Sequence, residues 1–145
     1  MLERGSGTII NVAGMIAFSG ASPAAPPQGQ RAVYAGSLAG TVAMSQTLHA
    51  ELEGSGVSVH VVCPGIVATE FHAVQGMDLS AVPRMRPEDV VTAALAGIEL
   101  GEVVIAPGVQ EAGLLETVFV ADRAAFQGQS PQIASRYTKS REAAG

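Results

Sequence analysis

Short apolar runs alternate along the chain with longer stretches in which apolar residues recur every three or four positions. Each run is followed by a turn that contains glycine, which predicts three strands: G-T-I-I-N-V (7–12), V-S-V-H-V-V (57–62) and E-V-V-I-A (102–106). The stretches between them predict amphipathic helices over 34–52 and 86–101. Because strands and helices alternate at these lengths, we expect right-handed crossovers and a parallel sheet.

The remaining segments predict a loop, a further helix and a tail. Residues 18–32 contain three prolines and two glycines, so we expect a loop there. Residues 111–127 carry apolar side chains at helical spacing, and the chain beyond Gln129 is polar. We therefore expect a folded part over 1–128 and a flexible tail over 129–145.

Composition narrows the class of protein. The chain has 145 residues and a net charge of -5, with no run of Lys or Arg that would attract a phosphate backbone or an anionic lipid surface. We therefore expect no nucleic-acid partner and no membrane association, and a cytoplasmic location. Cys63 is the only cysteine, and the three histidines are scattered, so the sequence predicts neither a disulfide nor a metal site.

Three motifs point to a known family. They are G-T-I-I-N-V-A-G from Gly7, Y-A-G-S-L-A-G-T-V-A-M-S from Tyr34, and V-S-V-H-V-V-C-P-G-I-V-A-T-E-F from Val57. In their order and in the elements they occupy, they resemble the short-chain dehydrogenase/reductases. The resemblance implies an α/β fold with a partial Rossmann-like, doubly wound parallel sheet of about three strands and flanking helices.

The resemblance covers the C-terminal half of the family's fold. The sequence contains no G-x-x-x-G-x-G phosphate loop, and no strand and helix precede Gly7. We therefore expect the first half of the fold to be missing. Met1 is then either an internal methionine of a longer protein or the start of a truncated gene.

The resemblance also implies an NAD- or NADP-dependent oxidoreductase that interconverts a small alcohol and a carbonyl compound. By its position, Tyr34 would give or take the hydroxyl proton. The segment P-G-I-V-A-T matches the family's P-G-x-x-x-T, in which Pro64 and Gly65 form the turn, the Ile66 backbone meets the nicotinamide carboxamide and the Thr69 hydroxyl reaches the cofactor. Glycine there permits close approach of a ligand to the backbone.

Two positions depart from the family's pattern. The family's catalytic lysine, four residues after the tyrosine, corresponds to Leu38, and its serine corresponds to Gly14. Tyrosine has an unperturbed pKa of about 10, so acid/base work near neutrality needs a nearby cation, which leucine does not supply.

Three functions remain open from the sequence. The chain is an oxidoreductase whose phosphate-binding half lies on a partner polypeptide, a catalytically inactive protein that uses helix 34–52 for oligomerisation or partner binding, or a truncated product. The resemblance also implies that the first strand has an unpaired edge, because the strand that flanks it in the family is missing from this sequence. Such an edge predicts a homo-oligomer or a complex with a complementing N-terminal half.

Overall fold

The computed structural model describes residues 1–20 and 31–142, which form two compact units, Met1–Gly108 and Val109–Gly145. The first unit contains the sheet, and the second contains two helices. Most of the predicted loop over 18–32 lies outside the described residues.

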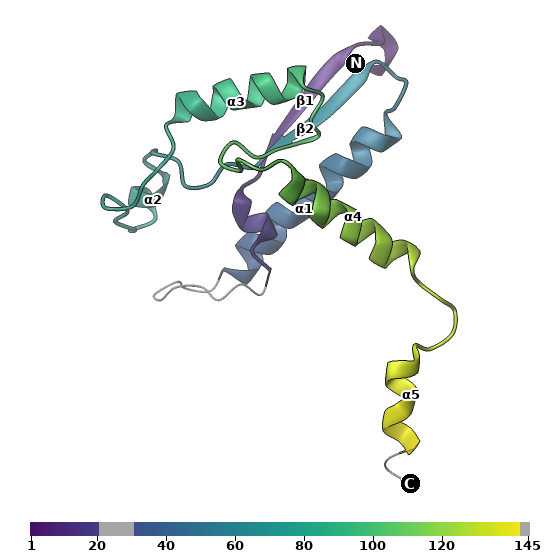
Figure 1. The fold of residues 1–145 in the computed structure, drawn as a ribbon. Coiled ribbons are helices and arrows are strands. Elements are labelled where there is room, and N and C mark those ends of the chain that lie inside the picture. The colour runs from purple at the N-terminus through teal and green to yellow at the C-terminus, as the bar shows by residue number, and fades with distance from the viewer. Residues whose placement is uncertain (21–30, 143–145) are drawn as a thin grey trace. The chain divides into compact units, whose positions relative to one another are not determined.

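Three parallel strands form the sheet, in the order β1 (Gly7–Val12), β2 (Val57–Val62) and β3 (Val104–Ile105) (Figure 1). The predicted bounds of β1 and β2 are confirmed, and all six residues of β1 pair with those of β2. The prediction of a third strand over 102–106 was too long. The Glu102 carbonyl oxygen lies 2.7 Å from His60 Nδ1, and the Glu102 N–H donates to the Gly97 carbonyl at 2.9 Å, so this residue serves contacts outside the strand ladder.

Helix α1 (Ala32–Glu51) covers one face of the sheet. It begins two residues before the predicted start. On this face, Asn11 Nδ2 donates a hydrogen bond of 2.9 Å to the fully buried Ser45 hydroxyl, which donates to the Thr41 carbonyl at 2.7 Å. The helix is therefore attached to β1 by a satisfied polar pair within the apolar layer.

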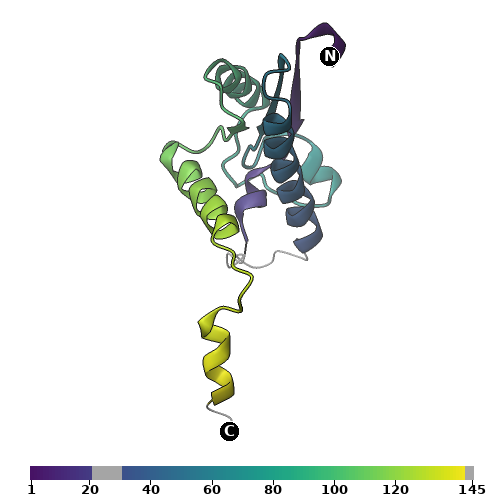
Figure 2. The same ribbon diagram turned by 90° about the vertical axis from the view of Figure 1, so that its right-hand side faces the viewer.

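Helix α3 (Pro87–Glu99) covers part of the opposite face (Figure 1 and Figure 2). Its buried Gly97 lies against the Ile105 side chain of β3. The helix does not cover β1, whose Ile10 and Val12 on this face are 45% and 68% exposed. One edge of β1 pairs with β2, and the other edge pairs with no strand in the described part of the chain.

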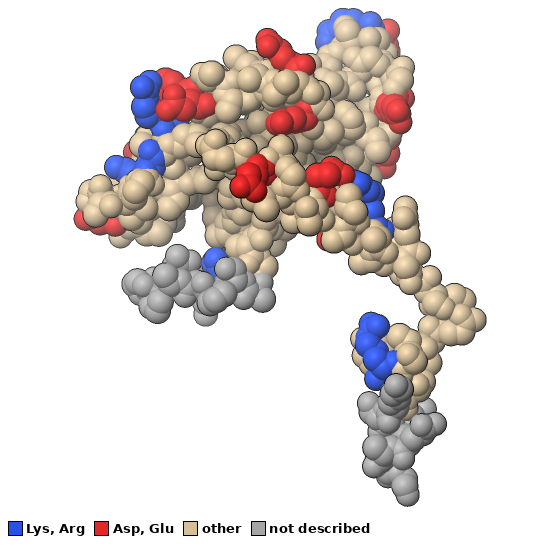
Figure 3. Space-filling model, in the orientation of Figure 1, with Lys and Arg blue, Asp and Glu red and all other residues tan. Residues whose placement is uncertain are grey.

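Shorter elements complete the first unit. They are the 3-10 turns η1 (Leu2–Arg4) and η2 (Met15–Phe18) and the single-turn helix α2 (Phe71–Val74). On the face shown in Figure 3, basic side chains are dispersed rather than gathered in one patch.

The second unit contains α4 (Gly113–Gln127), close to the helix predicted over 111–127, and α5 (Ser135–Glu142). Helix α5 lies within the polar tail predicted over 129–145. This polar segment has no run of apolar residues at helical spacing that would have predicted a helix. The division of the chain at residue 128 stays a prediction. Within 1–20 and 31–142, no helix has both the length and the hydropathy that crossing a bilayer requires.

Candidate functional site

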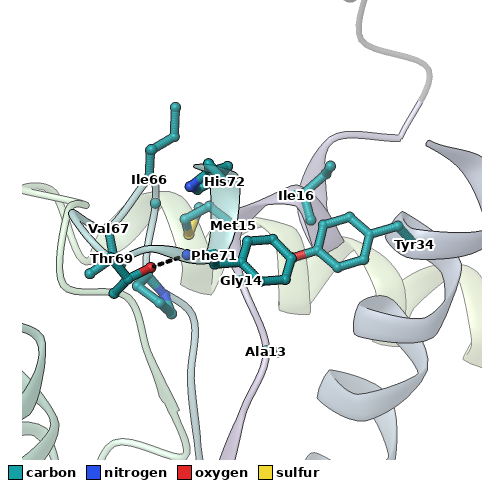
Figure 4. A pocket seen from close by; sticks show the side chains of 12 residues that line it. Ala13, Gly14, Met15, Ile16, Tyr34, Ile66, Val67, Thr69, Phe71 and His72 are labelled. Atoms are coloured by element: carbon teal, nitrogen blue, oxygen red, sulfur yellow. Dashed lines mark hydrogen bonds between the residues drawn. The ribbon is translucent and has the colours of Figure 1, made fainter. Parts of the chain in front are cut away.

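A cavity of about 380 Å³ opens where β1 and β2 end, at the carboxyl edge of the sheet where α/β proteins bind ligands (Figure 4). It is lined by Ala13, Gly14, Met15, Ile16, Tyr34, Pro64, Gly65, Ile66, Val67, Thr69, Phe71 and His72. The structure thus brings together all the site residues that the sequence predicted.

Backbone hydrogen bonds hold the two turns at the mouth of the cavity in register. The Ala13 N–H donates to the Val62 carbonyl at 2.8 Å, and the Met15 N–H donates to the Pro64 carbonyl at 2.9 Å. The second wall is fixed by Met85, whose N–H donates to the Ile66 carbonyl at 2.9 Å. The parallel ladder between β1 and β2 therefore continues past the strand ends and shapes the site.

Tyr34 lies in the first turn of α1 and is half exposed, at 49%. In Figure 4 its phenol points from the helix into the cavity, toward the ring of Phe71. The Tyr34 hydroxyl is therefore available to a molecule in the cavity.

The positions that depart from the family's pattern are neighbours in the structure. A Cβ atom built on Gly14 would lie 3.4 Å from Leu38 Cδ1 and 3.5 Å from the Pro64 carbonyl oxygen, which is ordinary van der Waals contact. A Cβ atom therefore has room at Gly14. Leu38 is apolar where the family's pattern has a lysine, and the described residues that line the cavity include no lysine, arginine or carboxylate.

The P-G-x-x-x-T segment forms an accessible wall. A Cβ atom on Gly65 would meet no atom within 4 Å, so the backbone there is open to close approach by a ligand. Thr69 Oγ1 accepts a hydrogen bond of 3.4 Å from the Phe71 N–H, which leaves the hydroxyl proton free to be donated. A planar amide such as a nicotinamide carboxamide fits this combination of open backbone and hydroxyl.

Beneath this wall, Cys63 is fully buried at the end of β2. Burial raises the pKa of the Cys63 thiol to about 11, against a smaller lowering by a hydrogen bond from the Gly14 backbone. The protonated, buried thiol is therefore a packing group and not a nucleophile.

The sequence did not identify His72 as a site residue. The ring belongs to α2 and packs edge-on against Phe71, with centroids 5.3 Å apart at 85°. Its Nδ1 atom is buried and has no hydrogen-bond partner in the described part of the chain. In the sequence, only its position three residues after Thr69 could have indicated that His72 belongs to the site.

Comparison with known proteins finds relatives among reductases and dehydrogenases. Residues 1–79 match the family described as short chain dehydrogenase. A putative ketoacyl reductase of Streptomyces coelicolor is 33% identical over 104 residues, which cover 72% of this chain and 37% of the reductase. An inactive 2-(S)-hydroxypropyl-CoM dehydrogenase 2 of Xanthobacter autotrophicus is 30% identical over 112 residues, 66% of this chain and 44% of that protein.

A solved structure agrees with these sequence relatives. The short-chain dehydrogenase from Sphingobium yanoikuyae, in complex with NADPH, superposes with a TM-score of 0.81 at 28% identity. The superposition covers 94% of this chain and 51% of that dehydrogenase, so the chain spans about half the length of this relative. The chain belongs to the short chain dehydrogenase family.

Proposed function

We propose that this chain supplies the substrate- and nicotinamide-binding half of an NAD(P)-dependent oxidoreductase that interconverts a small alcohol and a carbonyl compound. The observation that carries the proposal is that Tyr34 lines the same cavity as Pro64, Gly65, Ile66 and Thr69 and faces the wall that they form. A hydroxyl group on one side and open backbone on the other suit a substrate oxygen and a nicotinamide ring.

The cofactor fits the site in part. Ile66 and Thr69 would hold the carboxamide end of the nicotinamide, and the bound cofactor would supply or accept a hydride. The diphosphate end has no counterpart, because the sequence contains no G-x-x-x-G-x-G turn leading into a helix N-terminus. NADPH bound to the Sphingobium yanoikuyae relative supports a nicotinamide cofactor for a complete protein of this fold.

Tyr34 would hold the proton that moves to or from the substrate oxygen. Its phenol reaches the cavity, but the lining residues that the structure describes supply no ammonium or guanidinium group to stabilise a tyrosinate. We therefore expect little or no turnover from the chain alone.

The complementing partner would bind at the open edge of β1. Unpaired strand edges readily add another strand, and the exposed Ile10 and Val12 beside this edge offer an apolar surface. An N-terminal half of the same fold would pair with β1 and bring the phosphate loop. A second copy of the chain is the other partner that this surface suits.

The proximity of Gly14 and Leu38 favours a second function, that of a non-catalytic protein. Leu38 lies where a Gly14 side chain would touch it, so the site is apolar where the family's pattern has a lysine and a serine. The chain would then be a non-catalytic protein that acts through oligomerisation or partner binding. The inactive dehydrogenase of Xanthobacter autotrophicus is a relative with such a description.

Complementation distinguishes the two functions. The full chain is mixed with the part of the Sphingobium yanoikuyae dehydrogenase that it does not cover, and acetophenone-dependent loss of NADPH absorbance is measured. Turnover by the complemented chain that Tyr34→Phe abolishes supports the oxidoreductase. Turnover only after Gly14→Ser and Leu38→Lys are combined supports the non-catalytic protein, and no turnover in either mixture contradicts a dehydrogenase site in this cavity.

A further inference from the structure

Few polar side chains among the described residues line the cavity. Among the lining residues that the structure describes, only Tyr34, Thr69 and His72 contribute side-chain oxygen or nitrogen atoms. Most of the other side chains are aliphatic, aromatic or thioether groups. The described lining therefore suits a mainly apolar ligand, whose hydrogen-bonding atoms meet one of these three side chains or the open backbone at Gly65.

One ring nitrogen of His72, Nδ1, is buried without a hydrogen-bond partner in the described residues, whereas the ring itself lines the cavity. An N–H group buried without an acceptor costs about 1–3 kcal/mol, and unpaired N–H donors are rarer in proteins than unpaired acceptors. The neutral tautomer with its proton on Nε2 avoids this cost, so Nε2–H is the donor that the ring offers.

The ring is also held in place by its neighbours. It packs edge-on against Phe71, and α2 ends in a hydrogen bond of 2.8 Å from the Met77 N–H to the His72 carbonyl. A donor fixed in this way binds an oxygen at lower entropic cost than a freely rotating side chain does.

We propose that His72 is a specificity-determining residue, which donates a hydrogen bond from Nε2 to the carbonyl oxygen of an otherwise apolar ketone in this cavity. Gly14, which lines the same cavity, contributes no side-chain donor. The inference rests on the proposed function, because it takes the cavity to be a carbonyl-binding site. It adds the residue that recognises the oxygen and the ligand class, a ketone with apolar substituents.

The test compares a ketone with a hydrocarbon of similar shape. Acetophenone and ethylbenzene are titrated into the full ¹⁵N-labelled chain, the His72→Phe variant and the His72→Gln variant, and dissociation constants are obtained from backbone amide shifts. One neutral hydrogen bond corresponds to a factor of about three to ten in affinity. We expect His72→Phe to weaken the binding of acetophenone by this factor and to leave the binding of ethylbenzene unchanged. His72→Gln retains an N–H donor, so it should recover part of the lost affinity for acetophenone.

A second measurement does not depend on a variant. Imidazole ¹⁵N spectra of the wild-type chain report His49, His60 and His72 separately, and acetophenone should shift the Nε2 signal of His72 alone. For the titrations with the His72 variants, His49→Gln is the matched control, because His49 Nδ1 lies 3.2 Å from the Val59 carbonyl oxygen and the residue is not among those that line the cavity.

Each outcome is decisive. If His72→Phe loses the same affinity for acetophenone and ethylbenzene, or loses none for either, the role of His72 is overturned. The proposed function stays intact in that case, provided that the wild-type chain binds acetophenone. Absence of acetophenone binding by wild type overturns both.

Discussion

Replacing Gly97 by alanine tests the packing of α3 on β3. A Cβ atom at Gly97 would lie 2.7 Å from Ile105 Cγ1, 2.8 Å from Cγ2 and 2.9 Å from Cδ1. Ile105 is only 2% exposed and its Cβ is branched, so it has little freedom to move aside. Overpacking of this kind costs about 1–3 kcal/mol, against a gain of about 1 kcal/mol from replacing a helical glycine. Because Ile105 has little freedom to move, we expect a net loss of up to about 2 kcal/mol in the free energy of unfolding.

Gly40→Ala is the matched control for this change. Gly40 also lies in the interior of a long helix, but its Cβ would meet no atom within 4 Å, so only the helix gain of about 1 kcal/mol applies. Urea unfolding of the full chain, followed by circular dichroism, should place the two variants on opposite sides of wild type. The double variant Gly97→Ala/Ile105→Ala should lose less than the sum of the single losses, because it removes the clash. A Gly97→Ala variant as stable as Gly40→Ala would refute the packing described for α3.

Two further predictions concern stability against pH and assembly. Burial raises the pKa of Cys63 from 9.0 to about 11, so the folded state keeps the thiol proton where the unfolded state loses it. This contribution is complete below pH 9, and on the order of 2 kcal/mol is lost between pH 9 and pH 11. Urea unfolding across this range should show that loss in wild type and a smaller one in Cys63→Ala. Separately, the open edge of β1 should make the 14.7 kDa chain associate at micromolar concentration. Sedimentation velocity that gives one compact monomer at every concentration would contradict this expectation.

The sequence was sufficient for the elements whose signal is local. β1 and β2 are apolar runs closed by glycine turns, and both were predicted at their observed bounds. β3 was overestimated because the contact between His60 and the Glu102 carbonyl joins residues far apart in the chain. No local pattern reveals such a contact.

The same distinction applies to the site. The motif residues from Tyr34 to Thr69 were recognisable because their spacing is fixed along the chain, and the structure places them around one cavity. His72 was missed because a lone histidine in an irregular stretch looks like a surface residue. Its role depends on the burial of Nδ1, which exists only after α2 packs beside the turn that follows β2.

The cavity and the open edge of β1 depend on different parts of the first unit. The cavity depends on the pairing of β1 with β2, on the extra hydrogen bond from Met15 to Pro64, and on the attachment of α1 through Asn11 and Ser45. None of these contacts uses the unpaired edge of β1. The N-terminal half that we propose as a partner would therefore find Tyr34 and the wall formed by Pro64, Gly65, Ile66 and Thr69 already in place. In that proposal it contributes the phosphate-binding loop and covers the exposed strand, and the cavity does not depend on it.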